Sequence, residues 1–118
     1  PDSLHSIVPI ERRDIAIVRA AMVSVVSDPT GTGGQAKVDS IIVAGKTGTA
    51  QNPHGKDHAL FICFAPAEAP RIALAVLVEN AGHGSTAAAP IARKVLQAYF
   101  HPAPPESASP TANVVAKR

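Results

Sequence analysis

The stretch HALFICFAPAEAPRIALAVLVE, residues 58–79, decides the fold because it contains two apolar runs joined by the short connection PAEAP. Side chains alternate between the two faces of a strand, so Leu60 and Ile62 lie on one face of the first run and Phe61 on the other. The second run is also apolar on both faces. A connection this short excludes a helical crossover. The sequence therefore predicts an antiparallel pair of strands that is covered on both sides.

Helices are predicted before and after these two runs. In residues 11–27 the apolar side chains recur at three- and four-residue spacing, and Asp28 with Pro29 ends the pattern. A second helical pattern covers residues 87–100. Two helices are too few to cover both faces of a sheet completely. The predicted fold class is therefore α/β in the α+β sense, an antiparallel sheet with helices on its faces that is incomplete within this chain.

Composition excludes several classes of protein. A chain of 118 residues forms at most one domain, and its 3% aromatic content with a net charge of +2 and no basic block argues against nucleic-acid binding. The single cysteine, Cys63, excludes an internal disulfide and a multi-cysteine zinc site. The sequence has neither an apolar run of 18 residues nor a signal peptide. Because it begins at Pro1 without a methionine, we interpret it as a fragment whose targeting segment lies upstream.

The two ends of the chain differ in composition. Residues 1–100 hold all the periodic apolar patterns and are predicted to be the folded part. Residues 101–118, HPAPPESASPTANVVAKR, are rich in proline, serine and alanine and offer little to bury. This tail is predicted to be disordered.

The stretch VAGKTGTAQ, residues 43–51, is the strongest local motif, and it follows a glycine-rich loop at residues 30–36. A strand is predicted to begin at residues 41–44 and to run directly into GKTGTAQ. The tripeptide Gly-Lys-Thr also occurs in phosphate-binding P-loops. A P-loop needs a glycine where this chain has Ser40 and a helix where NPHG follows. Phosphate binding is therefore the weaker hypothesis.

The other interpretation treats Lys-Thr-Gly as part of a strand. Serine acyl-transfer enzymes that react with β-lactams combine K-T-G with S-x-x-K and a second serine motif. The stretches AGKTGTAQ, HALFICFAP and LVENAGHGSTAAAPIARKVLQAYF resemble, at matching distances, the C-terminal part of the transpeptidase domain of a class B penicillin-binding protein. The resemblance covers about residues 10–100 and is greatest to the elongation-type penicillin-binding protein 2 group, with the division type as the runner-up.

The resemblance implies a role for each residue of this motif. Lys46 is the catalytic residue that shapes electrostatics and proton transfer around the nucleophile. Thr47 and Thr49 are implied to bind the carboxylate of a β-lactam or peptide terminus through their hydroxyls, and the N–H of Thr49 to act as a catalytic oxyanion donor. Gly48 lets a substrate lie against the strand, and Gln51 completes the implied substrate-binding set. No cofactor is predicted, and no metal is assigned to this site.

The nucleophile of the family is missing from this sequence. No serine is followed three positions later by lysine, and no Ser-x-Asn occurs. We therefore interpret the chain as one wall of an active site and expect it to be inactive alone. The parent would be a serine-type D,D-transpeptidase that cross-links peptidoglycan. A module of the same fold that senses a β-lactam or peptide without turnover is the alternative.

The resemblance also implies partners and a location. These are the peptidoglycan stem peptide, β-lactam antibiotics, the missing N-terminal part of the same protein and a glycan polymerase in the membrane. The expected location is the periplasmic face of the bacterial cytoplasmic membrane, with an anchor outside this chain. No metal site is predicted, because Pro53 and Gly55 make the segment that holds His54 and His58 a turn, and no third ligand lies at a useful spacing.

Overall fold

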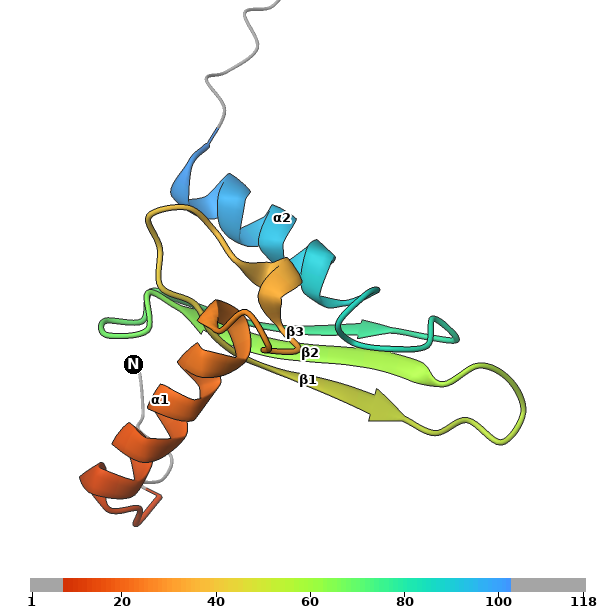
Figure 1. Ribbon diagram of the computed structural model, residues 1–118, viewed down its shortest axis with the longest axis horizontal. Helices are drawn as coiled ribbons and strands as arrows, with labels where there is room; N and C mark the ends of the chain where they lie inside the picture. Colours follow the sequence, from red (N-terminus) through yellow and green to blue (C-terminus); the bar gives the residue numbers. More distant parts are fainter. Residues whose placement is uncertain (1–7, 103–118) are drawn as a thin grey trace, which may run out of the picture.

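The computed structural model describes residues 8–102, in which three strands and two α-helices form the main elements (Figure 1). In chain order the elements are α1 (Arg12–Ser27), the short 3₁₀ helix η1 (Gly34–Ala36), β1 (Ala44–Ala50), β2 (His58–Ala65), β3 (Ile72–Val78) and α2 (Ala89–Phe100). The tail predicted to be disordered lies outside the described residues from position 103 onward.

The three strands form one antiparallel sheet in the order β1-β2-β3. Phe61 in the central strand β2 lies opposite Thr47 in β1 and Val76 in β3. This arrangement confirms the antiparallel pairing expected from the short connection between the last two strands. It also confirms the mixed fold class, with helices on the sheet faces.

One face of the sheet is covered by α2. Phe61 has no exposed surface and Cys63 only 3%, and both belong to a buried cluster with Ala92 and Leu96 of α2. Burial raises the pKa of the Cys63 thiol to about 11, so the thiol stays protonated at neutral pH. Cys63 therefore behaves as a small apolar side chain of the core, as expected from its neighbours in the sequence.

The segment between α1 and β1 differs from its sequence-based prediction in two places. The strand begins at Ala44 and not at residue 41, because Ser40 has a φ of 63° and Ile41 forms only an isolated bridge with Val38. The left-handed residue turns the chain between Val38 and Ile41, so Ile41 pairs back with Val38 and does not extend β1. The glycine-rich loop at residues 30–36 also contains regular structure, because its last three residues form η1.

The helix predicted over residues 87–100 is α2, which begins at Ala89. Pro90 lies in the first turn, where the helix needs no N–H donor from it. The N-cap residue is Ala88, which makes no side-chain cap. The carbonyl of Gly84 accepts hydrogen bonds from the amides of Ala88 and Ala89 instead, at 3.2 and 2.8 Å.

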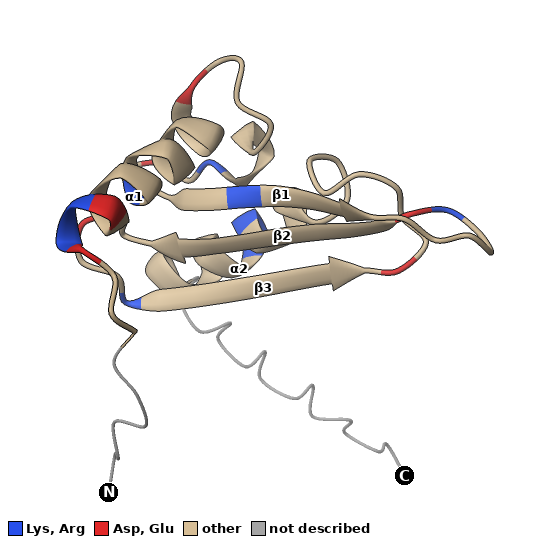
Figure 2. Cartoon of the chain, turned by 90° about the horizontal axis from the view of Figure 1, so that it is seen from below, with Lys and Arg blue, Asp and Glu red and all other residues tan. Residues whose placement is uncertain are grey.

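The opposite face of the sheet is only partly covered, because α1 lies mainly along β1 (Figures 1 and 2). Ile62 of β2 and Leu77 of β3 are 50% and 59% exposed on this face. The apolar stripe of α1 is half-buried at Met22 and Val25 but exposed at Val18. The sequence-based expectation that the chain lacks part of its cover is therefore confirmed for this face, which we name the open face.

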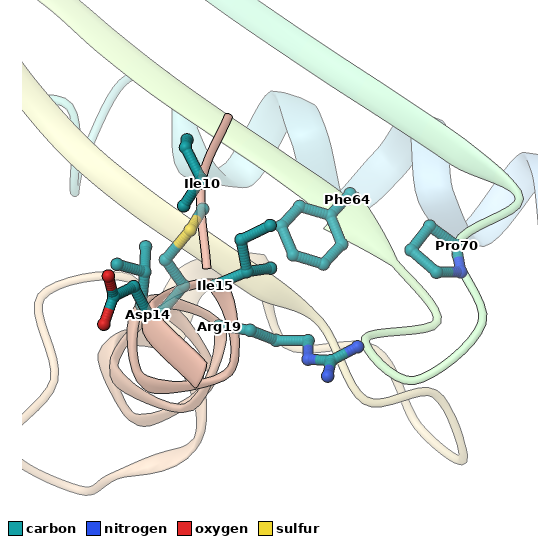
Figure 3. A pocket seen from close by; sticks show the side chains of 8 residues that line it. Ile10, Asp14, Ile15, Arg19, Phe64 and Pro70 are labelled. Atoms are coloured by element: carbon teal, nitrogen blue, oxygen red, sulfur yellow. The ribbon is translucent and has the colours of Figure 1, made fainter. Parts of the chain in front are cut away.

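An apolar groove runs between α1 and the sheet on the open face. Its volume is about 310 Å³, and its walls include Ile15 and Met22 from α1, Phe64 from β2 and Pro70 from the following turn (Figure 3). No helix within residues 8–102 is long and apolar enough to cross a membrane.

We expect the 118-residue chain, produced alone, to associate and to bind an apolar dye through the open face. Replacing Ile62 and Leu77 together by serine should lower dye binding, because both side chains are half-exposed there. Replacing the exposed Gln35 by serine is the matched control and should leave dye binding unchanged. Dye fluorescence and light scattering measure both effects. A monodisperse monomer without dye binding would contradict our description of this face.

Candidate active site

The KTGT residues lie on β1, at the edge of the sheet. Within residues 8–102, β1 pairs with β2 on one side and with no strand on the other. Alternate N–H and C=O groups of an edge strand point away from its partner. The strand therefore offers a row of backbone hydrogen-bonding groups to an extended ligand. Lys46 is the one basic residue of β1, which is seen as a blue band on this strand in Figure 2.

The ammonium group of Lys46 lies at this edge. Its side chain is exposed and projects from the same face as Ile62, its partner on β2. Its Nζ donates a hydrogen bond to the carbonyl oxygen of Thr47 at 2.7 Å. This contact indicates that the backbone of Thr47 faces the free edge. Thr49 lies two residues further along the strand, so its N–H points the same way.

The hydroxyl groups of the motif lie on the other face of the strand. Thr47 and Thr49 alternate with Lys46 and share the face of Phe61, with Thr47 half-buried and Thr49 exposed. The Oγ1 atom of Thr47 is hydrogen-bonded to Oγ1 of Thr32 at 2.8 Å. The cation and the hydroxyls therefore flank the free edge from two sides.

Sequence reasoning missed Thr32, which lies 15 positions before its partner. The composition of residues 30–36 predicts only a connecting loop. The signal that was available is the glycine on each side of Thr32 in the run Thr30-Gly31-Thr32-Gly33. Such flanking glycines are typical of a backbone that approaches other atoms closely.

Gly84, and not Gly48, is the glycine that allows close packing behind the middle of β1. A Cβ atom built on Gly48 would make only an ordinary contact of 3.4 Å with Cβ of Leu60. A Cβ atom on Gly84 would lie 2.0 Å from the carbonyl oxygen of Leu60 and 2.7 Å from that of Gly48. The loop before α2 therefore packs directly on the backbone of the KTGT strand, which leaves this strand little freedom to shift.

A polar cluster holds the loops beyond the end of β1. The amide of Asn52 donates to the side-chain oxygen of Asn80 at 2.7 Å, and the N–H of Asn80 donates to Nδ1 of His58 at 3.1 Å. Asn80 has a φ of 54°, a conformation that asparagine tolerates. Gln51 lies between this cluster and β1 and is exposed. The cluster joins the β1–β2 loop to the turn after β3.

The structure also bears on two other kinds of site, a phosphate-binding P-loop and a metal site. Gly45, Lys46 and Thr47 lie inside a strand that leads to a hairpin loop, so the P-loop hypothesis is wrong. His58 accepts a hydrogen bond from the backbone of Asn80. Between residues 8 and 102, no three histidine, cysteine, aspartate or glutamate side chains form a group that could hold a metal ion.

The sequence matches one protein-family model and several curated proteins. The model is that of the penicillin binding protein transpeptidase domain, and it covers residues 3–97. The peptidoglycan D,D-transpeptidase MrdA of Haemophilus influenzae is 40% identical over an alignment of 99 residues, and the match covers 70% of this chain and 15% of that protein. The chain therefore spans about a seventh of the length of this relative.

Two solved structures illustrate the similarity of fold. The PBP2 of Pseudomonas aeruginosa, in complex with WCK 5153, is 42% identical with a TM-score of 0.73, and the match covers 86% of this chain and 23% of that one. The imipenem acyl-enzyme of penicillin-binding protein A from M. tuberculosis is 35% identical with a TM-score of 0.65, and the match covers 77% and 20%.

Replacing Gly84 by alanine should destabilise the protein by roughly 1–3 kcal/mol, the usual cost of forcing an extra methyl group into a packed site. The added Cβ would collide with the backbone of β1 and β2. Gly34→Ala is the matched control, because a Cβ there meets nothing within 4 Å. Its effect should stay within about 0.5 kcal/mol. Thermal denaturation of both variants measures the difference, and equal melting temperatures would contradict the described packing.

Proposed function

The chain belongs to the penicillin-binding protein transpeptidase family, and from this premise we propose that it carries the KTGT wall of a peptidoglycan D,D-transpeptidase active site. Its relatives include proteins named MrdA and PBP2, which confirms the resemblance to the penicillin-binding protein 2 group seen in residues 10–100. The observation that carries the proposal is the edge strand β1. Its consecutive residues combine an ammonium group, two hydroxyls and unpaired backbone groups.

In this proposal the free edge of β1 binds the end of a peptide or a β-lactam. The ligand pairs with the edge as an added strand would. The hydroxyls of Thr47 and Thr49 donate hydrogen bonds to the ligand carboxylate. The N–H of Thr49 stabilises the negative charge that develops on the carbonyl oxygen during acyl transfer. Lys46 adds a positive charge beside both groups, and exposed Gln51 extends the binding surface at the end of the strand.

The nucleophile would come from another part of the same protein. Acyl transfer through serine needs an activated hydroxyl beside a base, and this sequence contains no Ser-x-x-Lys. We propose that the serine and its lysine lie upstream and face β1 across a cleft. The small share of MrdA that the chain matches, 15%, supports this arrangement. The open face would then pack against the same upstream part.

The wider roles follow from the same proposal. The substrate would be a peptidoglycan stem peptide, and β-lactams would inhibit by acylating the serine. The protein would act on the periplasmic side of the cytoplasmic membrane, beside a glycan polymerase. A sensor module of this fold would be acylated by a β-lactam without turning over a stem-peptide analogue. Turnover of such an analogue by the full-length protein therefore separates the two functions.

We expect the isolated 118-residue chain to remain unlabelled by a fluorescent penicillin, because the nucleophile motif is not in its sequence. The full-length protein that contains this chain is the positive control and should be labelled. Mass spectrometry of both samples locates any adduct. Stoichiometric acylation within the isolated chain would contradict the assignment of the nucleophile to another segment.

In the full-length protein, Lys46→Ala should nearly abolish acylation. Thr47→Val and Thr49→Val should each cost on the order of 1.5–3 kcal/mol, the range for a hydrogen bond to a charged group. Lys94→Ala removes an exposed lysine of α2 and is the matched control. Second-order acylation rate constants measure all four variants. A rate for Lys46→Ala close to that of the control would show that the site is misplaced.

A further inference from the structure

The loop that carries Thr32 has a fixed backbone. The amide and the hydroxyl of Thr30 both donate to Oδ1 of Asp28, at 2.8 and 2.7 Å. The amide of Gly31 donates to the carbonyl of Asp28 at 2.9 Å, and that of Gly33 donates to the carbonyl of Val25 at 2.8 Å. The chain is therefore anchored to the end of α1 on both sides of Thr32.

Steric fit fixes this loop further. A Cβ atom on Gly31 would lie 2.3 Å from the carbonyl oxygen of Val25, and one on Gly33 would lie 3.0 Å from Cγ1 of the same residue. Only glycine permits the approach at position 31. Between these two glycines, Thr32 is exposed and extends its hydroxyl to Thr47. The loop thus presents one polar side chain to the KTGT strand from a rigid backbone.

The chemistry of two paired hydroxyls determines what this contact can do. A hydroxyl has one proton to donate and two lone pairs to accept with. If Thr47 is to donate to a carboxylate, it cannot also donate to Thr32. Its bond of 2.8 Å to Thr32 must then run from the Thr32 hydroxyl to Oγ1 of Thr47. An anion at the free edge favours this direction, because Thr47 then points its only proton at the negative charge.

We propose that Thr32 is a positioning residue for Thr47, donating its hydrogen bond to Oγ1 of Thr47 so that the Thr47 proton is directed at a ligand carboxylate. This inference rests on the proposed function, because it needs an anionic ligand at β1. Thr32 itself does not touch the ligand. Because the Thr47 proton is then directed at the ligand, the Thr32–Thr47 pair favours a ligand with a charged carboxylate over a neutral one. It therefore affects ligand specificity as well as the rate of acylation.

The test uses the full-length protein and compares Thr32→Val with Thr32→Ser. Valine keeps the shape but removes the donor, and serine restores it. We expect Thr32→Val to lower the second-order rate constant for acylation by benzylpenicillin about three- to tenfold, the range for one neutral hydrogen bond. Thr32→Ser should return the rate to within about twofold of wild type. The methyl ester of benzylpenicillin lacks the carboxylate charge, and its rate should fall much less in Thr32→Val.

Two controls separate positioning from general loop structure. Thr30→Val removes the hydroxyl bond to Asp28 in the same loop but leaves the Thr32–Thr47 contact, so it should retain the wild-type rate. In a Thr47→Val background, Thr32→Val should cause no further loss, because the residue through which it acts is gone.

The outcomes distinguish this inference from the proposed function. A wild-type protein that is never acylated would overturn the proposed function. If wild type is acylated, the inference is overturned by an unchanged rate in Thr32→Val, by failure of serine to restore the rate, or by an equal loss with the ester. Full additivity of the Thr32 and Thr47 substitutions would also overturn it, since it would show that Thr32 acts independently.

Discussion

The single-sided pairing of β1 is the constraint on which the rest of the site depends. An edge strand keeps half of its backbone groups free for a ligand, but it also exposes them to unwanted pairing with other strands. Lys46 bears on both ligand binding and the prevention of unwanted strand pairing. Its ammonium group occupies the Thr47 carbonyl at 2.7 Å and places a charge where another strand would otherwise dock. In our proposal a ligand carboxylate forms a charge-assisted interaction with this ammonium group, whereas the uncharged backbone of another strand cannot.

An edge strand has only one neighbour to hold it, so other contacts must fix its position. Three of them come from different parts of the chain. Gly84 packs on the backbone of β1 and β2, and Thr32 is hydrogen-bonded to Thr47. Beyond the end of the strand, Asn52 and Asn80 join the two adjacent loops. Together these contacts preorganise the strand, which is what a site that stabilises developing charge requires.

The sequence predicted the elements that depend on local periodicity and missed the contacts between distant positions. The bounds of β2 and the presence of both helices followed from apolar spacing. The start of β1 was placed too early, because the left-handed conformation of Ser40 leaves no mark in an apolar pattern. Thr32 and Thr47 lie 15 positions apart, and Asn52 and Asn80 lie 28 apart. The roles of Lys46 and Thr49 came from family resemblance, because periodicity carries no information about chemistry.

The open face and Lys46 lie on the same side of the sheet. Lys46 projects from the face that carries the half-exposed Ile62, whereas the opposite face is closed by α2. In our account the upstream part of the protein covers this face and brings the nucleophile to Lys46. The cleft therefore forms at the boundary between this chain and the remainder of the protein. In this proposal, the same packing interaction buries the open face and places the nucleophilic serine beside Lys46.

The most direct test of this account is a crystal structure of the full-length protein acylated by benzylpenicillin. We expect the ligand to lie along the free edge of β1, with its carboxylate within roughly 3 Å of the hydroxyls of Thr47 and Thr49. We also expect the acylated serine to come from a segment packed on the open face. A ligand bound away from β1, or a free edge filled by another strand of the protein, would contradict it.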